Sequence, residues 1–266
     1  NSEGKRVELE GDARVAVYKA IQELPNVHLI AEDKQAAAVL ASYSAQVDEM
    51  KSTIIGSADA NLCLERIPGQ GKSKLCDASE TASNGSDISN LVSHAFRDMA
   101  RTSDIAIQNG GGVRVDVAAG EFSIGDAYTL LPFANTLVEL EMTGAEIAAV
   151  LEDALDYALN PEGSTGAYPY AAGLRWDIDA SQPKGQRFSN IQFKGPDDNS
   201  WTALDMSRSY TVVTNNYISA GRDGYLNFGD ITKEGRVKET YIDYAQRFVD
   251  YVRKVGVLQQ LPECRY

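Results

Sequence analysis

The spacing of apolar positions along this 266-residue chain changes from segment to segment. Where apolar side chains recur every three or four residues, the pattern predicts an amphipathic helix. Such segments are found at 35–51, 87–101, 143–160 and 238–254. Asp33 stands where an N-cap is expected before the first segment. Thr143, with Glu146 three residues later, has the form of a capping box at the start of the third segment.

Other segments carry short runs of alternating or β-branched residues, which are typical of strands. These runs lie at 52–64, 104–108, 135–141, 174–179, 188–193 and 210–214. Residues 122–131 predict a turn and a short strand. Helices and strands alternate without a strict strand–helix–strand repeat, so we predict an α+β (mixed α/β) fold.

The charge of the chain narrows the range of partners. Asp and Glu number 38 against 25 Lys and Arg, for a net charge of −13. The electrostatic field of this negative charge repels polyanions, so no nucleic-acid polymer is expected as a partner. A local cationic pocket can still hold a small anion. No apolar run is long enough to span a membrane.

Two of the three cysteines, Cys63 and Cys76, bracket the loop CLERIPGQGKSKLC. One hypothesis joins them in a disulfide and leaves Cys264 free. The alternative is two unrelated buried thiols. We favour the disulfide, which would stabilise the fold by roughly 3 kcal/mol and would indicate an oxidising compartment, periplasmic or extracellular.

The residues needed for catalysis are missing from the sequence. Metal-dependent hydrolysis uses clusters of His, Asp and Glu, but the only histidines are His28 and His94. His94 falls on the helix predicted at 87–101, where a structural role is expected. The chain also lacks the HExxH, GxSxG, GxxxxGK[ST] and GxGxxG motifs. We therefore predict neither a metal site nor a cofactor in this chain.

What the sequence does offer is residues for recognition. In QNGGGVR, Asn109 and three glycines follow a predicted strand, which allows a ligand to approach the backbone closely, and Arg114 adds a fork of donors for an oxygen-rich group. The alternative is a glycine turn with a surface arginine.

Two later stretches supply aromatic and polar side chains. In PFANT, Phe133 and Asn135 share one face of an extended segment, an arrangement that suits stacking on a nucleobase and reading its edge. In TNNYISAGRDGYLNF, Tyr217 precedes a turn that contains Asp223. Taken singly, each ring is more often part of the core than of a binding site.

In combination, NGGGVR, LPFANTLVELEMTGAEI and TNNYISAGRDGY resemble the C-terminal substrate-binding domain of the 5′-nucleotidase family, which includes periplasmic UDP-sugar hydrolases and the vertebrate ecto-5′-nucleotidase. The three motifs occur in order between Ile54 and Phe228. The resemblance implies that residues 1–32 are the tail of an N-terminal metallophosphoesterase domain, that 33–51 form an interdomain linker helix, and that 52–266 form a single substrate-binding domain. The start at Asn1 fits a processed product or an excised piece.

The resemblance also implies roles for individual residues. The expected substrate-binding set is Phe133, Tyr217, Asn109, Asn135, Asp223, Arg114, Arg66, Gly111 and Gly112. The two rings would sandwich the base and the two asparagines would bond its edge. The aspartate would accept from the ribose hydroxyls beside the two glycines. The two arginines would bind the phosphate or ribose side.

In this family the N-terminal domain holds two divalent metal ions and performs the hydrolysis. Its DxH and GNHE stretches are absent from this sequence. We therefore expect the parent protein to be a nucleotide hydrolase and this chain alone to be inactive. The alternatives are a stand-alone nucleoside-binding module and a structural or adhesive surface domain. Whether the parent acts on AMP, UDP-sugars, NAD or 2′,3′-cyclic nucleotides stays open at this point.

Overall fold

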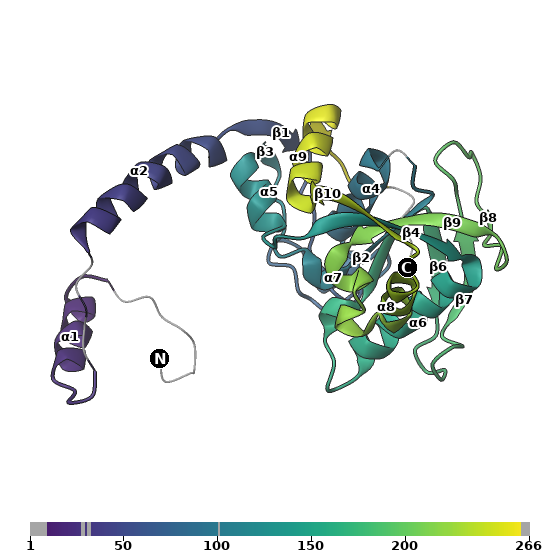
Figure 1. Cartoon of the computed structure of the whole chain (residues 1–266), viewed down its shortest axis with the longest axis horizontal. Coiled ribbons are helices and arrows are strands. Elements are labelled where there is room, and N and C mark those ends of the chain that lie inside the picture. The colour runs from purple at the N-terminus through teal and green to yellow at the C-terminus, as the bar shows by residue number, and fades with distance from the viewer. Residues whose placement is uncertain (1–9, 28–29, 31–32, 101, 262–266) are drawn as a thin grey trace. The chain divides into compact units, whose positions relative to one another are not determined.

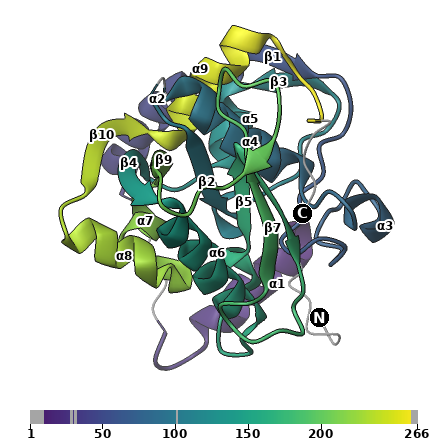
Figure 2. The same cartoon turned by 90° about the vertical axis from the view of Figure 1, so that its right-hand side faces the viewer.

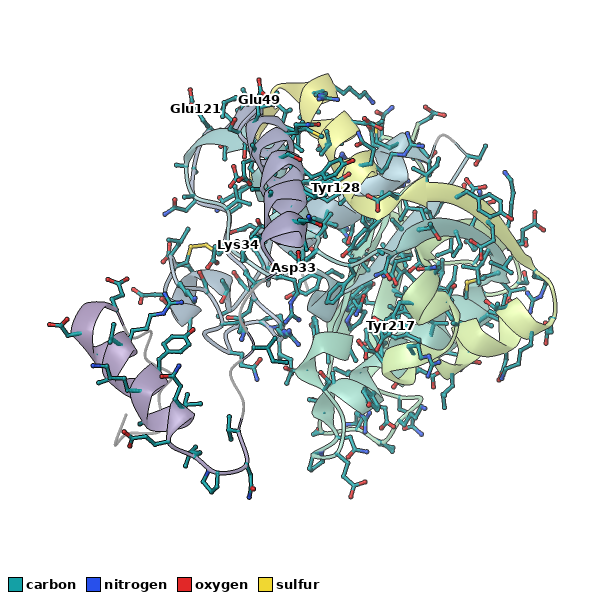
Figure 3. The ribbon with its side chains drawn as sticks, turned by 60° about the vertical axis from the view of Figure 1, so that its left-hand side comes forward. Asp33, Lys34, Glu49, Glu121, Tyr128 and Tyr217 are labelled. Atoms are coloured by element: carbon teal, nitrogen blue, oxygen red, sulfur yellow. A yellow bond between two sulfur atoms is a disulfide. The ribbon has the colours of Figure 1, made fainter. Side chains whose placement is uncertain are left out.

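The computed structural model of the chain describes residues 10–27, 30, 33–100 and 102–261. It divides into two compact units, Asn1–Glu49 and Met50–Tyr266. The first contains α1 (Gly11–Gln22) and most of α2 (Lys34–Lys51) (Figure 1). The predicted cap of α2 is present, because the Asp33 carboxylate accepts hydrogen bonds from the amides of Gln35 and Ala36, both at 2.9 Å. Figure 3 labels Asp33 and Lys34 at one end of this helix and Glu49 near the other.

The second unit is built on a five-stranded sheet with the order β10-β4-β9-β2-β5 (Figure 2). The strands are β2 (Ile105–Asn109), β4 (Thr136–Thr143), β5 (Pro169–Ala172), β9 (Ser209–Asn215) and β10 (Val237–Asp243). Strands β2 and β9 run parallel, and the other neighbouring pairs run antiparallel. This mixed sheet confirms the predicted fold class.

Alternate residues of β2 enter two separate cores, as the two-residue period of a strand requires. Ile105 and Ile107 pack in one core with α6 (Gly144–Leu159). Ala106 packs in the other core with α4 (Asp87–Met99) and α9 (Tyr244–Val255). Strand β2, all five residues of which are buried, is therefore covered on both faces.

Smaller elements surround this sheet. Two three-stranded sheets have the orders β11-β1-β3 and β6-β7-β8. Their strands are β1 (Ile54–Ala58), β3 (Gly120–Ser123), β6 (Leu174–Ile178), β7 (Phe188–Phe193), β8 (Thr202–Ala203) and β11 (Val257–Leu258). The remaining helices are α3 (Ala78–Thr81), α5 (Ile124–Leu130), α7 (Asn216–Ser219) and α8 (Leu226–Lys233). Three single 3₁₀ turns are η1 (Gly110–Gly112), η2 (Thr165–Ala167) and η3 (Arg222–Gly224).

Two sequence-based predictions were wrong in part. Residues 122–131 contain helix α5 rather than a turn and a strand, because Ser123 and Asp126 form a reciprocal capping box that starts a helix. Residues 237–243 form strand β10, where a helix was predicted from 238. The strand pairs with β4, and the Asp243 side chain caps the helix that follows by accepting from the Gln246 amide at 2.7 Å.

The predicted disulfide joins Cys63 and Cys76, whose Cα atoms are 6.0 Å apart (Figure 3). The loop between them is organised by the fully buried carboxylate of Glu65. This carboxylate accepts from the amide of Gly71 at 2.7 Å and from the hydroxyl of Thr81 at 3.1 Å. The bridge and the carboxylate thus fix the loop that carries Arg66. Cys264 lies outside the described residues.

Candidate functional site

All nine side chains and glycines of the predicted substrate-binding set line one cavity of about 270 Å³. Ser164 and Gly166, which the sequence analysis did not single out, complete its lining. The contributing segments are the disulfide-bridged loop with Arg66, the end of β2 with η1 and Arg114, the loop before β4, the turn around η2, and the α7–η3 region. Asn109 and Asp223, which are 114 residues apart in the sequence, meet at this point through a hydrogen bond.

The glycines after β2 allow two backbones to meet at the floor of the cavity. A Cβ atom on Gly111 would lie 3.1 Å from both the Cα and the carbonyl oxygen of Gly166. A Cβ on Gly112 would overlap the amide of Gln108. A side chain at Gly111 would therefore crowd the Gly166 backbone, and one at Gly112 would displace the end of the Gln108 side chain, so glycine suits both positions.

A hydrogen-bonded network holds the polar groups of the cavity. The side-chain NH₂ group of Asn109 donates to one carboxylate oxygen of Asp223 at 3.0 Å, and the Tyr217 hydroxyl donates to the other oxygen at 3.0 Å. The Asn109 oxygen in turn accepts from the Asn215 amide at 3.1 Å. The side-chain oxygen of Asn215 also caps α7 by accepting from the backbone N–H of Tyr217 at 3.1 Å. Two strand ends, one helix start and one turn are thereby joined.

Asp223 adopts a left-handed backbone conformation, with φ of +52°. Residues other than glycine rarely adopt this conformation, although Asp and Asn do so more readily than most. The flanking Gly221 and Gly224 have φ of +82° and +77°. Strain of this kind concentrates at functional sites, where the surrounding structure sustains it. Here the two hydrogen bonds to its carboxylate fix the Asp223 side chain in the cavity.

Two aromatic rings in the cavity lining are partly open to solvent. Phe133 is 45% exposed and Tyr217 is 43% exposed, and Figure 3 labels Tyr217. The Phe133 amide donates to the hydroxyl of the buried Tyr244 at 3.0 Å, which fixes the loop that carries the ring. Thr136 is held similarly, because its amide donates to the Asn216 side chain at 3.2 Å. The rings are thus exposed side chains on an anchored backbone.

Two arginines give the cavity a local positive charge. The Arg114 guanidinium lies 5.6 Å from the centre of the Phe133 ring, and it donates to the Gly111 carbonyl at 3.2 Å. Arg66 lies against Gly166, where any Cβ would overlap its guanidinium. Burial, and secondly the neighbouring charge of Arg114, lower the pKa of Arg66, while Asp223 opposes this shift. The guanidinium remains charged because its ordinary pKa is far above neutrality.

The buried Nε atom of Arg66 has no hydrogen-bond partner among the described residues. A buried charged donor without a partner is costly, and an anionic ligand would satisfy it. Phosphate and carboxylate oxygens match the fork geometry of two converging arginines. The cavity therefore combines open rings, fixed amides, a carboxylate and a site for a small anion.

Ser164 and Gly166 were missed because their contribution depends on backbone shape. Both belong to the sequence PEGSTGA, which reads as an ordinary turn. The Ser164 hydroxyl accepts from the Gly166 amide at 3.1 Å and starts η2. Asn215 was also missed, since it lies behind the cavity and acts through its partners.

The described residues outside this cavity add no catalytic constellation. They contain no cluster of three or more His, Cys, Asp or Glu that could bind a metal ion. His94 packs edge-on to Tyr251, with ring centres 6.1 Å apart, and burial lowers its pKa. His28 falls among the residues that are not described. Among the helices of the described part, none has the length and apolar character needed to cross a bilayer.

Comparison with known proteins agrees with these features. The family described as "5′-nucleotidase, C-terminal domain" matches residues 59–230. The chain is 31% identical over 257 residues to the NAD 5′-nucleotidase of Haemophilus influenzae, a match that covers 96% of this chain and 42% of that protein. It is also 31% identical to a probable 5′-nucleotidase of Treponema pallidum, covering 94% of this chain and 42% of the relative.

Among solved structures, the H. influenzae NAD nucleotidase superposes with a TM-score of 0.70 at 30% identity, covering 99% of this chain and 46% of that one. The chain belongs to the 5′-nucleotidase family and contains its C-terminal domain. It spans about 42% of the length of the two curated relatives.

Proposed function

We propose that the cavity binds the nucleoside part of a nucleotide, and that the whole protein is a metal-dependent 5′-nucleotidase or related nucleotide hydrolase. In this proposal residues 1–32 end an N-terminal metallophosphoesterase domain, 33–51 form the linker helix, and 52–266 present the substrate. The two divalent metal ions and the hydrolytic step belong to the N-terminal domain. The observation that carries the proposal is the convergence of all nine expected residues on one cavity.

Each group in the cavity matches one part of a nucleotide. Phe133 and Tyr217 present ring faces on which a base can stack. Asn135 offers an amide to the base edge. The Asp223 carboxylate has four lone-pair sites, so it can accept from ribose hydroxyls while keeping its two existing hydrogen bonds.

The phosphate end is assigned to Arg66 and Arg114. These are the two cationic residues in the cavity lining, and they face the single carboxylate of Asp223. A nucleoside monophosphate should therefore bind more tightly than the nucleoside itself. The disulfide supports a periplasmic or extracellular location, because such bridges persist in oxidising compartments.

Calorimetric titration with adenosine, AMP and NAD tests the proposal. NAD is included because the H. influenzae relative is named an NAD 5′-nucleotidase. We expect AMP to bind the native chain more tightly than adenosine. In Arg114→Gln the ratio of AMP affinity to adenosine affinity should fall by roughly tenfold, because one charge-assisted hydrogen bond to the phosphate is lost.

Arg253→Gln serves as the matched control, since Arg253 is an exposed arginine of α9 that does not line the cavity. It should leave both affinities unchanged. Equal binding of AMP to the native chain and to Arg114→Gln would remove the assigned phosphate site. Absence of binding by all three ligands would overturn the proposed function itself.

A further inference from the structure

A second cavity, of about 340 Å³, lies away from the nucleoside cavity. The two cavities share no lining residue. Strands β2 and β5 are antiparallel, and Asn109 pairs with Pro169 at the nucleoside end while Ala106 pairs with Ala172 at the other end. The second cavity forms beside Ala172, between α4, the β5–β6 corner and the loop that follows β7. Its volume falls within the range of small-molecule pockets.

Two polar atoms of its lining residues are buried without partners among the described residues. They are the Oδ1 atom of Asn90 and the Nε atom of Arg97. Both side chains are otherwise fixed: the Asn90 amide donates to the Asn84 carbonyl at 3.0 Å, and an Arg97 Nη donates to the Lys194 carbonyl at 2.6 Å. Buried polar atoms are nearly always satisfied in native proteins. Within the described part of the chain, the cavity therefore offers one free acceptor and one free donor. A ligand that satisfies both must itself carry a hydrogen-bond donor and a hydrogen-bond acceptor.

The charges at this cavity favour an anion. Arg97 and Lys194 are cationic, and Lys194 lies 5.9 Å above the ring of Trp201. Burial lowers the pKa of His94 and so disfavours its charged form. The Asp198 carboxylate is engaged by the Gly195 amide at 2.9 Å. The lining therefore carries two cations and one carboxylate, and Asp104, which lies outside the lining, also acts electrostatically on Arg97.

The rest of the wall is apolar and includes Leu174, Leu261 and the indole of Trp201. A flat apolar body would bury its surface against such walls. An inorganic anion would leave them exposed to water. A free nucleotide carries more charge than two cations beside a carboxylate accommodate well.

We propose that this second cavity binds a small aromatic carboxylate that also carries a hydrogen-bond donor. The carboxylate is bound by Arg97 and Lys194, the donor reaches Asn90, and the ring packs beside Trp201. The site is separate from the nucleoside cavity and does not depend on the function proposed for it.

Indole fluorescence provides a direct readout. The chain has two tryptophans; Trp201 lines the cavity, whereas Trp176 is 3% exposed and does not line it. The probe is 4-hydroxybenzoate, with 4-hydroxybenzamide to remove the charge and benzoate to remove the donor. We expect saturable binding of 4-hydroxybenzoate, weakened roughly tenfold for the amide and severalfold for benzoate.

Substitutions in the lining test whether 4-hydroxybenzoate binds in the second cavity. Lys194→Gln should weaken 4-hydroxybenzoate binding severalfold, whereas Lys233→Gln, which removes an exposed lysine outside both cavities, should not. Asn90→Leu removes the acceptor at similar volume, and should weaken 4-hydroxybenzoate binding severalfold while leaving benzoate binding unchanged. It provides the decisive test if Lys194→Gln does not fold. Circular dichroism confirms the fold of each variant.

Three results would overturn this inference. One is the absence of saturable binding by any of the three probes. Another is unchanged 4-hydroxybenzoate affinity in folded Lys194→Gln or Asn90→Leu. The third is competition by adenosine or loss of binding in Phe133→Ala, which would assign the probe to the nucleoside cavity.

Discussion

Tyr217 and Tyr225 are eight residues apart, yet they belong to different parts of the molecule. Tyr217 is 43% exposed in the cavity and its hydroxyl bonds to Asp223. Tyr225 is fully buried, its hydroxyl donates to the Ala167 carbonyl at 2.8 Å, and its ring stacks on Phe228 with centres 5.7 Å apart. One ring is available to a ligand, and the other is part of the core.

The turn between these tyrosines produces the difference. Asn215 caps α7 and leaves Tyr217 at the surface. The chain then reverses through the left-handed residues Gly221, Asp223 and Gly224, after which Tyr225 enters the core. A Cβ on Gly224 would overlap Tyr157, so this path requires glycine. The same segment therefore supplies one ring for binding and one for stability, and substitutions should separate the two roles.

The largest effect is expected from Tyr225→Ala. Removal of a fully buried aromatic ring should lower the free energy of unfolding by about 3–5 kcal/mol, measured by urea denaturation. Tyr217→Ala is the matched control and should lower it by less than about 1 kcal/mol, as is usual for an exposed side chain. Equal losses in the two variants would remove the distinction between the two tyrosines.

Asp223→Asn should weaken adenosine binding by roughly tenfold, because the ribose loses an ionised acceptor. The variant retains the backbone, since Asn tolerates the left-handed conformation. Its new NH₂ group can donate to the Tyr217 hydroxyl, which also accepts, while its oxygen still accepts from the Asn109 side chain. Free adenine, measured by the same calorimetry, should be nearly unaffected. An equal loss for adenine and adenosine would contradict a role at the sugar.

Glu146 is a polar residue that does not line the nucleoside cavity. It completes the capping box of α6 and pairs with Arg236 at 2.6 Å, and chiefly this contact with Arg236 lowers its pKa to about 2. Because the folded pKa is depressed, the stabilisation is present above the ordinary pKa near 4.5 and is lost as the pH falls toward 2.

We expect Glu146→Gln to cost about 1 kcal/mol at pH 7, a value reduced for solvent screening, and progressively less at lower pH. Denaturation across this pH range is the measurement. Adenosine affinity at pH 7 should be unchanged. A loss of stability that is independent of pH would show that the pair with Arg236 is not its source.

The smallest effect is expected from Tyr217→Phe. Stacking depends on the ring face, which phenylalanine retains, and Asp223 keeps its hydrogen bond from Asn109. Adenosine affinity should change by less than about threefold, because the exposed hydroxyl contributes little. A larger calorimetric change would mean that the hydroxyl orients Asp223 for the ribose.

The sequence was most informative where local pattern and tertiary structure agree. The capping box at Thr143 and Glu146 correctly predicted the start of α6. The boundary at Asp243 could not be predicted, because residues 237–243 become a strand only through pairing with β4. For α5 the signal was present in Ser123 and Asp126 and was overlooked.

The residues of the nucleoside cavity also divide into those that the sequence predicted and those that it did not. The rings, amides and charges were selected because the three motifs that carry most of them resemble a known family in combination, although each residue alone was ambiguous. Ser164 and Gly166 were not selected, because they contribute a backbone surface that forms only when η2 meets η1. The hydrogen bonds that Asp223 accepts from Asn109 and Tyr217 likewise join residues whose contact depends on the complete fold.

In the proposed complex, a nucleobase is bound between Phe133 and Tyr217. Calorimetric titration of adenosine into the native chain, Phe133→Ala and Tyr217→Ala tests this arrangement most directly, on variants whose unfolding free energy is verified beforehand. Each ring should contribute about 1–3 kcal/mol of stacking, so each variant should bind roughly five- to hundredfold more weakly than the native chain. Folded variants that bind adenosine as tightly as the native chain would contradict this arrangement and the site assignment that depends on it.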